Sequence, residues 1–175
     1  MLRHQRLCLC LVLCLSAAVS SAADEIDLQR ISFSGWQARL AAYPPDIVVV
    51  DMWATWCVSC IERFPKMVEL YRQYHDRGVR FVSMCLDEHT DQPAIDRARQ
   101  FLRKNNARFE HYLMDENLME AFEKLDLIGI PAVVIYGRNG AERFRLTGDN
   151  PNRQFTDRDI ENAIRQLLDH GAEQT

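Results

Sequence analysis

One stretch of the sequence decides the fold: IVVVDMWATWCVSC, from Ile47 to Cys60. Its first part, Ile47–Trp53, is a continuous and largely β-branched run, which is typical of a central strand that is buried on both faces. Two cysteines, Cys57 and Cys60, follow this run closely. We therefore expect them to lie where a buried strand gives way to the first turn of a helix.

The start of a helix is a favourable place for a reactive thiol. The first turn has unpaired N–H groups and the positive end of the helix dipole, and both stabilise a thiolate. A thiolate is the attacking species in disulfide exchange, so Cys57 is predicted to be the nucleophile. Cys60 lies one turn further on, close enough to displace a mixed disulfide formed at Cys57. The intervening Val58 and Ser59 carry no charge that would stabilise the thiolate further.

Two structural interpretations of the cysteine pair compete with a redox role. A structural zinc site needs about four ligands, and the sequence has no second Cys-x-x-Cys and no Cys/His pair with finger spacing. We therefore predict that the protein holds no metal and no cofactor. An inert disulfide is the other alternative. The placement of the pair between a strand and a helix favours redox chemistry over both.

Asp51 is an ionisable residue inside the apolar run. If its side chain is buried, desolvation raises the pKa of the carboxyl group, and Asp51 can then exchange protons with Cys60. If that face of the strand opens to solvent, Asp51 is an ordinary surface carboxylate. Position alone leaves both interpretations open.

Pro131, after Ile130, begins another apolar strand and marks either a sheet edge or a cis peptide bond in a tight turn.

The remaining patterns predict alternating strands and helices. Besides Ile47–Trp53, strands are expected at 28–32, 79–86, 109–114, 131–136 and 141–147. Helices are expected at 34–42, 57–75, from 93 onward, at 117–125 and from 156 onward. Ser34 is the predicted N-cap of the first helix, and 137–140 is predicted to be a hairpin turn. The resulting order, β-α-β-α-β-α-β-α-β-β-α, predicts an α/β domain with early parallel crossovers and a final hairpin.

The N-terminus has the features of an export signal. Arg3 and Arg6 precede a short apolar run, and small residues precede Asp24. These features predict a signal peptide over residues 1–23 and one domain over residues 24–175. The apolar run is shorter than the roughly 18 residues that a membrane span needs.

A lipid-attachment signal is an alternative to an ordinary signal peptide. Cys14 lies late in the apolar run, where such a signal would place its cysteine. A bacterial lipid-attachment site has small residues just before its cysteine, whereas Leu13 is large. We therefore favour the ordinary signal peptide.

Composition narrows the function further. The formal net charge is −4, which argues against nucleic acid or an anionic membrane as a partner. Three of the six cysteines belong to the predicted signal peptide, so too few remain for a disulfide framework. Besides the pair, only Cys85 is left, and we expect it to be a small buried hydrophobic residue, with a third redox thiol as the alternative.

Other polar residues carry no functional prediction. The acidic pairs at 87–88 and 115–116 stand at the ends of predicted elements, where charges are usually solvated. His89 and His111 have no partner at metal-ligand spacing. We expect both to be surface or packing residues.

With these elements in place, the sequence resembles the thioredoxin superfamily, and within it the extracytoplasmic TlpA/ResA-like thiol–disulfide oxidoreductases. The resemblance rests on the strand and loop at 50–60, on Pro65 in the following helix, on Gly-Ile-Pro-Ala at 129–132 and on Gly148. The extra helix and strand within 93–114 and the predicted export signal resemble the extracytoplasmic members more than cytosolic thioredoxin.

The resemblance implies a thioredoxin-like α/β fold, in which helices flank a central mixed β-sheet and an extra helix and strand precede a cis-proline. It implies that Cys57 is an exposed nucleophile and Cys60 a buried resolving thiol. Pro131 is implied to be cis and to pack beside the cysteines. Ile130 would offer backbone groups to an extended substrate peptide, and Trp56 would lie over the active site.

The sequence also departs from the family pattern. Asp51 matches the buried proton-relay Asp of thioredoxin, whereas many TlpA/ResA-like proteins have Asn there. Many relatives have Glu three residues after the second cysteine, and this sequence has Arg63. The dipeptide Val58-Ser59 is neither the Gly-Pro of thioredoxin nor the Pro-His of strong oxidants. These departures leave the redox direction and the substrate open.

By analogy with the TlpA/ResA-like reductases that it resembles, we predict a periplasmic or otherwise extracytoplasmic reductase that acts as a monomer on cysteine pairs of exported proteins. Export removes it from cytosolic reductants, so a membrane-bound electron donor is expected. One alternative is a non-catalytic, peptide-binding adaptor with the thioredoxin fold. Another is a thiol peroxidase that uses Cys57 or Cys85, although the Pro-x-x-x-Thr-x-x-Cys pattern of peroxiredoxins is absent.

Overall fold

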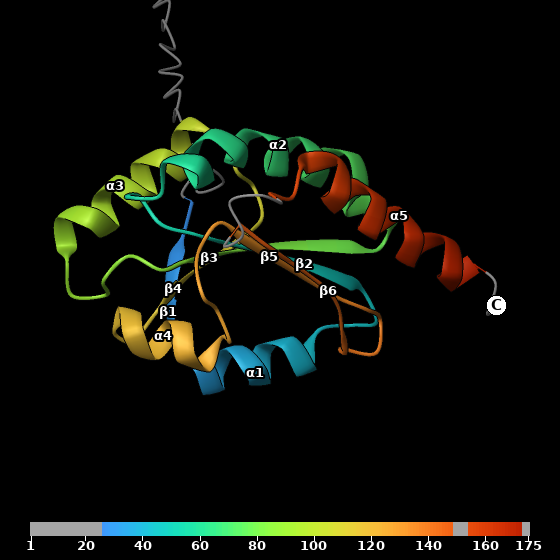
Figure 1. The fold of residues 1–175 in the computed structure, drawn as a ribbon, viewed down its shortest axis with the longest axis horizontal. Coiled ribbons are helices and arrows are strands. Elements are labelled where there is room, and N and C mark those ends of the chain that lie inside the picture. The colour runs from blue at the N-terminus through green and yellow to red at the C-terminus, as the bar shows by residue number, and fades with distance from the viewer. Residues whose placement is uncertain (1–25, 149–153, 173–175) are drawn as a thin grey trace, which may run out of the picture.

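The structure, a computed structural model, describes residues 26–148 and 154–172, and these form a sheet covered by helices on both faces (Figure 1). The strands are β1 (Leu28–Ile31), β2 (Ile47–Trp53), β3 (Val79–Cys85), β4 (Glu110–Met114), β5 (Ala132–Tyr136) and β6 (Glu142–Thr147). The helices are α1 (Phe33–Ala42), α2 (Val58–Tyr74), the short 3-10 helix η1 (His75–Arg77), α3 (Gln92–Lys104), α4 (Leu118–Lys124) and α5 (Asp157–Ala172). Apart from η1, the predicted order is confirmed. The predicted signal peptide lies outside the described residues.

The sheet has the strand order β1-β4-β3-β2-β5-β6. The first four strands are parallel, and β5 and β6 are antiparallel to their neighbours, so the predicted mixed sheet is confirmed. Helices α1 and α4 cover one face, and α2, α3 and α5 cover the other (Figure 1). Every residue of the central strand β2 is buried, as its continuous apolar run predicted.

The two faces of β2 belong to different cores. Residues 48, 50 and 52 pack with Trp36 of α1 on one side of the sheet. On the other side, Val49 packs in a core with Leu70 of α2, and Trp53 packs in a core with Phe64 of α2. Because side chains alternate along a strand, Asp51 faces the α2 side, between these two cores.

The inserted helix and strand are present as predicted, and β4 lies between β1 and β3 in the sheet. The predicted cap of α1 is wrong by two residues. Ser32, not Ser34, is the N-cap, because Ser32 has extended backbone geometry and its Oγ accepts a hydrogen bond from the Gly35 N–H at 3.2 Å. Ser34 lies inside the first turn of α1.

Of the helices described here, none is long and apolar enough to span a membrane.

Candidate active site

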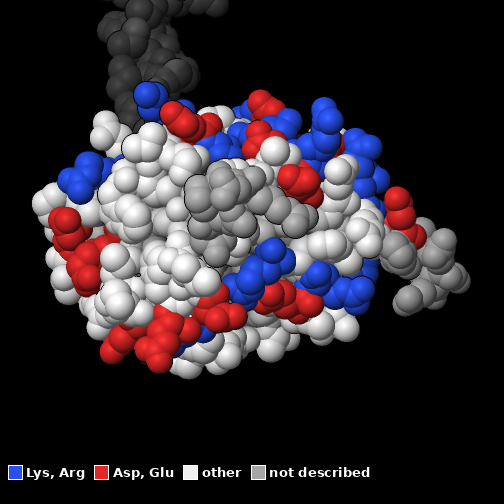
Figure 2. Space-filling model, viewed as in Figure 1, with Lys and Arg blue, Asp and Glu red and all other residues white. Residues whose placement is uncertain are grey.

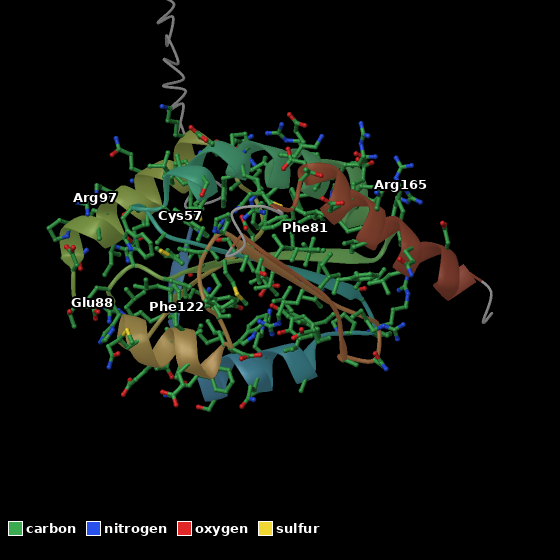
Figure 3. The ribbon with its side chains drawn as sticks, in the orientation of Figure 1. Cys57, Phe81, Glu88, Arg97, Phe122 and Arg165 are labelled. Carbon is green, nitrogen blue, oxygen red and sulfur yellow. A yellow bond between two sulfur atoms is a disulfide. The ribbon has the colours of Figure 1, made fainter. Side chains whose placement is uncertain are left out.

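A disulfide joins Cys57 and Cys60 at the start of α2 (Figure 3). Strand β2 ends at Trp53, and the Cys57 N–H then donates a hydrogen bond to the Ala54 carbonyl oxygen at 3.1 Å. Cys57 is the N-cap of α2, and its Sγ accepts a hydrogen bond from the Cys60 N–H at 3.3 Å. The sulfur of Cys57 therefore lies at the end of the helix where unpaired N–H groups and the positive end of the dipole stabilise a thiolate.

The two cysteines differ in burial. Cys60 is completely buried, and Cys57 is 6% exposed. The expectation of an openly exposed Cys57 is therefore corrected for the disulfide form, because both cysteines pack in the core that contains Trp53 and Phe64. Only Cys57 of the pair retains solvent-accessible surface. Its assignment as the nucleophile stays a prediction.

The Ile130–Pro131 peptide bond is cis, as the resemblance implied. Ile130 packs against the core that holds both cysteines, so this loop lies beside the disulfide. The Gly148 N–H donates a hydrogen bond to the Pro131 carbonyl oxygen at 2.9 Å. A Cβ on Gly148 would lie 3.1 Å from Pro131 Cδ, and this close approach explains why the position is glycine.

Exposed apolar side chains come from the segments that form this site. Trp56 is 54% exposed and Val58 is 71% exposed, one on each side of Cys57 in the chain. Ile128, just before the cis-proline loop, is 85% exposed. In Figure 2 the surface on the side of the molecule where Cys57 lies is largely uncharged, and acidic side chains gather below it, over α4. The site thus has an apolar surface suited to contact with another polypeptide.

Asp51 is buried and paired with a cation, so it is not an ordinary surface carboxylate. Its side chain is 1% exposed, and Arg63 Nη2 of α2 donates to its Oδ1 at 2.5 Å. Burial raises the pKa of the Asp51 carboxyl group, while the adjacent Arg63 acts in the opposite direction. No hydrogen bond between Asp51 and either cysteine occurs among the described residues. Arg63 connects Asp51 to the helix that carries them.

Arg63 is a site residue whose partner the sequence did not reveal. Its side chain is 9% exposed, and its Cζ lies 5.0 Å from the centre of the Phe155 ring. The sequence marked position 63 only as a departure from the family pattern. The twelve-residue separation from Asp51 carries no periodic signal. The contact requires α2 to pack across β2.

Asp87 was predicted to be solvated, and this prediction is wrong. Asp87 is 3% exposed, because it follows β3 at the same edge of the sheet as the cysteine loop. The Thr55 N–H donates to its Oδ2 at 2.9 Å, and the Thr55 Oγ1 donates to its Oδ1 at 2.7 Å. The free thiol of Cys85 also donates to Oδ2, at 3.1 Å. Asp87 therefore holds the loop that precedes Cys57.

Cys85 and His111 are packing residues. Cys85 is buried, as predicted, and burial raises the pKa of its thiol well above the usual value. His111 is also buried, with Nδ1 2.8 Å from Ser83 Oγ and Nε2 3.0 Å from the Ala107 carbonyl oxygen. Burial lowers the pKa of His111 to about 4. Among residues 26–148 and 154–172, no group of three or more His, Cys, Asp or Glu residues is placed to hold a metal ion.

The fold and the disulfide site together define a thioredoxin-like protein. The sequence profile of the Redoxin family matches residues 18–164, so the chain belongs to the Redoxin family.

Individual relatives have related names. The thiol-disulfide oxidoreductase ResA of Oceanobacillus iheyensis is 35% identical over 71 residues, which are 39% of this chain and 37% of ResA. The thiol:disulfide interchange protein DsbE of Vibrio cholerae is 26% identical over 140 residues, which are 80% of this chain and 71% of DsbE. The match therefore spans little more than a third of ResA and most of DsbE.

A solved structure supports the fold. The crystal structure of a thiol:disulfide interchange protein of the thioredoxin family from Chlorobium tepidum superimposes with a TM-score of 0.55 at 20% identity. The superposition covers 75% of this chain and 84% of that one. The likeness confirms the thioredoxin-like fold that the sequence predicted.

Proposed function

We propose that this protein is a thiol–disulfide oxidoreductase that reduces cysteine pairs in exported proteins. The observation that carries the proposal is the Cys57–Cys60 disulfide at the start of α2, with the cis Ile130–Pro131 loop packed against the same core. The names of the ResA and DsbE relatives agree with this activity.

The reaction begins with the dithiol form. The thiolate of Cys57 attacks one sulfur of the substrate disulfide, and the other substrate sulfur leaves as a thiolate. The thiolate of Cys60 then attacks Cys57 Sγ and releases the second substrate sulfur. Two electrons pass to the substrate, whose thiolates take up protons from solvent. The protein is left with the Cys57–Cys60 disulfide.

Asp51 is the proton acceptor for the second step, in which Cys60 loses its proton and attacks Cys57 Sγ. Cys60 is completely buried, so its thiol has no direct access to solvent. Burial raises the pKa of Asp51, which brings the carboxyl group closer to the pH range in which it can both take and return a proton.

The substrate is held next to the cysteines. Ile130 offers its backbone groups to an extended segment beside Pro131, and Trp56 covers the segment from the other side of Cys57. The exposed fraction of Trp56, 54%, leaves its ring available for this contact. The protein acts as a monomer on this substrate.

Export and electron supply complete the proposal. Residues 1–23 act as a signal peptide, which directs the domain to the periplasm or another extracytoplasmic compartment. Each turnover leaves the protein oxidised, so a membrane-bound dithiol donor must return two electrons to Cys57 and Cys60.

Covalent trapping tests this function. The Cys60→Ser variant, expressed with its N-terminal segment, should accumulate mixed disulfides between Cys57 and exported proteins, and mass spectrometry of these adducts identifies the substrates. The Cys57→Ser, Cys60→Ser variant is the matched control and should form none. If the Cys60→Ser variant forms no adduct while Cys57 alkylates as a free thiol, the nucleophile assignment is wrong. If the double variant keeps full biological activity, the protein is an adaptor.

A further inference from the structure

Two departures from the family pattern meet in the structure. Position 51 has Asp where many TlpA/ResA-like proteins have Asn, and position 63 has Arg where many have Glu. These two side chains are 1% and 9% exposed and form an ion pair, with Arg63 Nη2 2.5 Å from Asp51 Oδ1. A neutral and an acidic residue are thus replaced by an acidic and a basic residue in direct contact.

Arg63 follows the buried Cys60 by about one turn of α2. Residues three apart on a helix are neighbours on its surface, so Arg63 is a neighbour of Cys60 on the surface of α2. The ion pair with Arg63 connects Asp51 to the helical turn that follows Cys60. Among the described residues, Asp51 Oδ1 accepts from Arg63, and Asp51 Oδ2 has no hydrogen-bond donor. Oδ2 is therefore the oxygen that remains to accept a proton.

The surroundings give Asp51 one compensating charge. Burial raises the pKa of its carboxyl group, the negative charge of Asp157 on α5 adds to this rise, and Arg63 opposes both. On the neighbouring strand β3, Ser83 lies opposite Asp51 and is hydrogen-bonded to His111, which is neutral near pH 7 because burial lowers its pKa to about 4. An ionised carboxylate that is buried without a charged partner is strongly destabilised and takes up a proton instead.

We propose that Arg63 is the positioning residue of this active site: its guanidinium binds Asp51 Oδ1 and leaves the ionised Oδ2 to take the proton of Cys60. The Cys60 thiol transfers its proton to Asp51, the Cys60 thiolate attacks Cys57 Sγ, and Arg63 remains charged throughout. This inference rests on the proposed function, in which Asp51 serves Cys60. It adds a residue that the family pattern does not contain.

The two half-reactions can be timed separately in the whole protein. The reduced protein is mixed with an equimolar amount of 5,5′-dithiobis(2-nitrobenzoate), a disulfide that releases a coloured thiolate. Attack by Cys57 releases the first thiolate in a bimolecular step, and attack by Cys60 on the mixed disulfide releases the second in a unimolecular step. Both rates are followed by stopped-flow absorbance from about pH 5 to pH 9, a range that covers the titration of a carboxyl group with a raised pKa. The wild type is compared with Arg63→Met, Arg63→Lys, Asp51→Asn and the Asp51→Asn, Arg63→Met double variant.

Loss of Arg63 should slow only the second step. In Arg63→Met the pH midpoint of the unimolecular rate should rise by about one unit, so the rate at any pH well below the wild-type midpoint falls by about tenfold. Arg63→Lys, which keeps a charge, should stay within about threefold of the wild type. Asp51→Asn should be slow at every pH in this range, and adding Arg63→Met to it should change the rate little, because both residues act through one proton acceptor.

Two results would overturn the proposal. One is an Arg63→Met variant whose second step has the pH profile of the wild type. The other is an equal slowing by Arg63→Met in the presence and absence of Asp51, which would mean that Arg63 acts on the thiolate directly. If Arg63→Met does not fold, as judged by near-UV circular dichroism, the comparison of Arg63→Lys with Asp51→Asn decides in the same way. Failure of the proposed function is distinct, because the wild type would then release no second thiolate.

Discussion

Two buried carboxylates, one within β2 and one just after the neighbouring strand β3, differ in the groups that donate to them. Asp51 in β2 is 1% exposed and has one charged partner, Arg63, with one oxygen that receives no donor among the described residues. Asp87 after β3 is 3% exposed and accepts three hydrogen bonds from uncharged donors on Thr55 and Cys85. The donors of Asp87 fix the loop that precedes Cys57, whereas Asp51 keeps the capacity to bind a proton. We propose that the number and charge of the donors separate the structural carboxylate, Asp87, from the carboxylate that takes part in the chemistry, Asp51.

The largest expected effect is on stability and comes from Asp87→Ala. This change leaves the donors of Thr55 and Cys85 without their acceptor, and each buried polar group so left costs about 1–3 kcal/mol. We expect the free energy of unfolding, measured by urea denaturation, to fall by about 3 kcal/mol. Asp91→Ala is the matched control, since Asp91 only caps α3, and it should cost about 1 kcal/mol. Equal losses for the two variants would contradict the structural role of Asp87.

A smaller effect concerns the pH dependence of stability at Asp51. Burial raises the pKa of this carboxyl group in the folded protein above the value of about 3.9 in the unfolded chain. The folded state therefore holds the proton more tightly, so the contribution of Asp51 is fully present below about pH 3.9 and is lost as the pH rises through the folded pKa. Each unit of difference changes the free energy of unfolding by about 1.4 kcal/mol.

The measurement is urea denaturation of the oxidised wild type and of Asp51→Asn at a series of pH values. Relative to Asp51→Asn, the wild type should lose stability as the pH rises above about 4 and through the folded pKa. The difference between two variants at one pH removes the contributions of other groups, such as His111. A constant difference across this range would mean that Asp51 has the same pKa in the folded and unfolded states.

The smallest effect is expected at Cys85. A serine hydroxyl can donate to Asp87 as the thiol does, so Cys85→Ser should change the free energy of unfolding by less than about 1 kcal/mol. Adduct formation by Cys57 in the Cys60→Ser background should be unaffected. Loss of the adducts in the Cys85→Ser variant would restore the interpretation of Cys85 as a third redox thiol.

Local patterns predicted the elements that carry the cysteines. The β-branched run predicted β2 with its observed bounds. A strand that is buried on both faces has a nearly continuous apolar sequence, and the run from Ile47 to Trp53 has this pattern. The helix after Cys57 followed from its apolar spacing. The cap of α1 was misplaced because Ser32 and Ser34 are both good caps, and only the extended backbone of Ser32 distinguishes them.

Long-range contacts were the part that local patterns did not predict. The cis bond before Pro131 was implied by the family resemblance and not by its neighbours in the chain. The pair formed by Asp51 and Arg63 depends on how α2 crosses β2. Asp87 was taken for a solvated charge because the end of a strand usually reaches the surface. Here the loop that carries Thr55 folds over it.

The reduction potential of the Cys57–Cys60 pair tests the central claim most directly. The protein is equilibrated in thiol–disulfide buffers of graded potential, and the fraction of the dithiol form is measured by alkylation and mass spectrometry. A reductase should show one reversible two-electron transition near the thioredoxin value of about −270 mV. A midpoint near about −120 mV, as in a strong oxidant, or a pair that does not equilibrate with the buffer, would contradict the account.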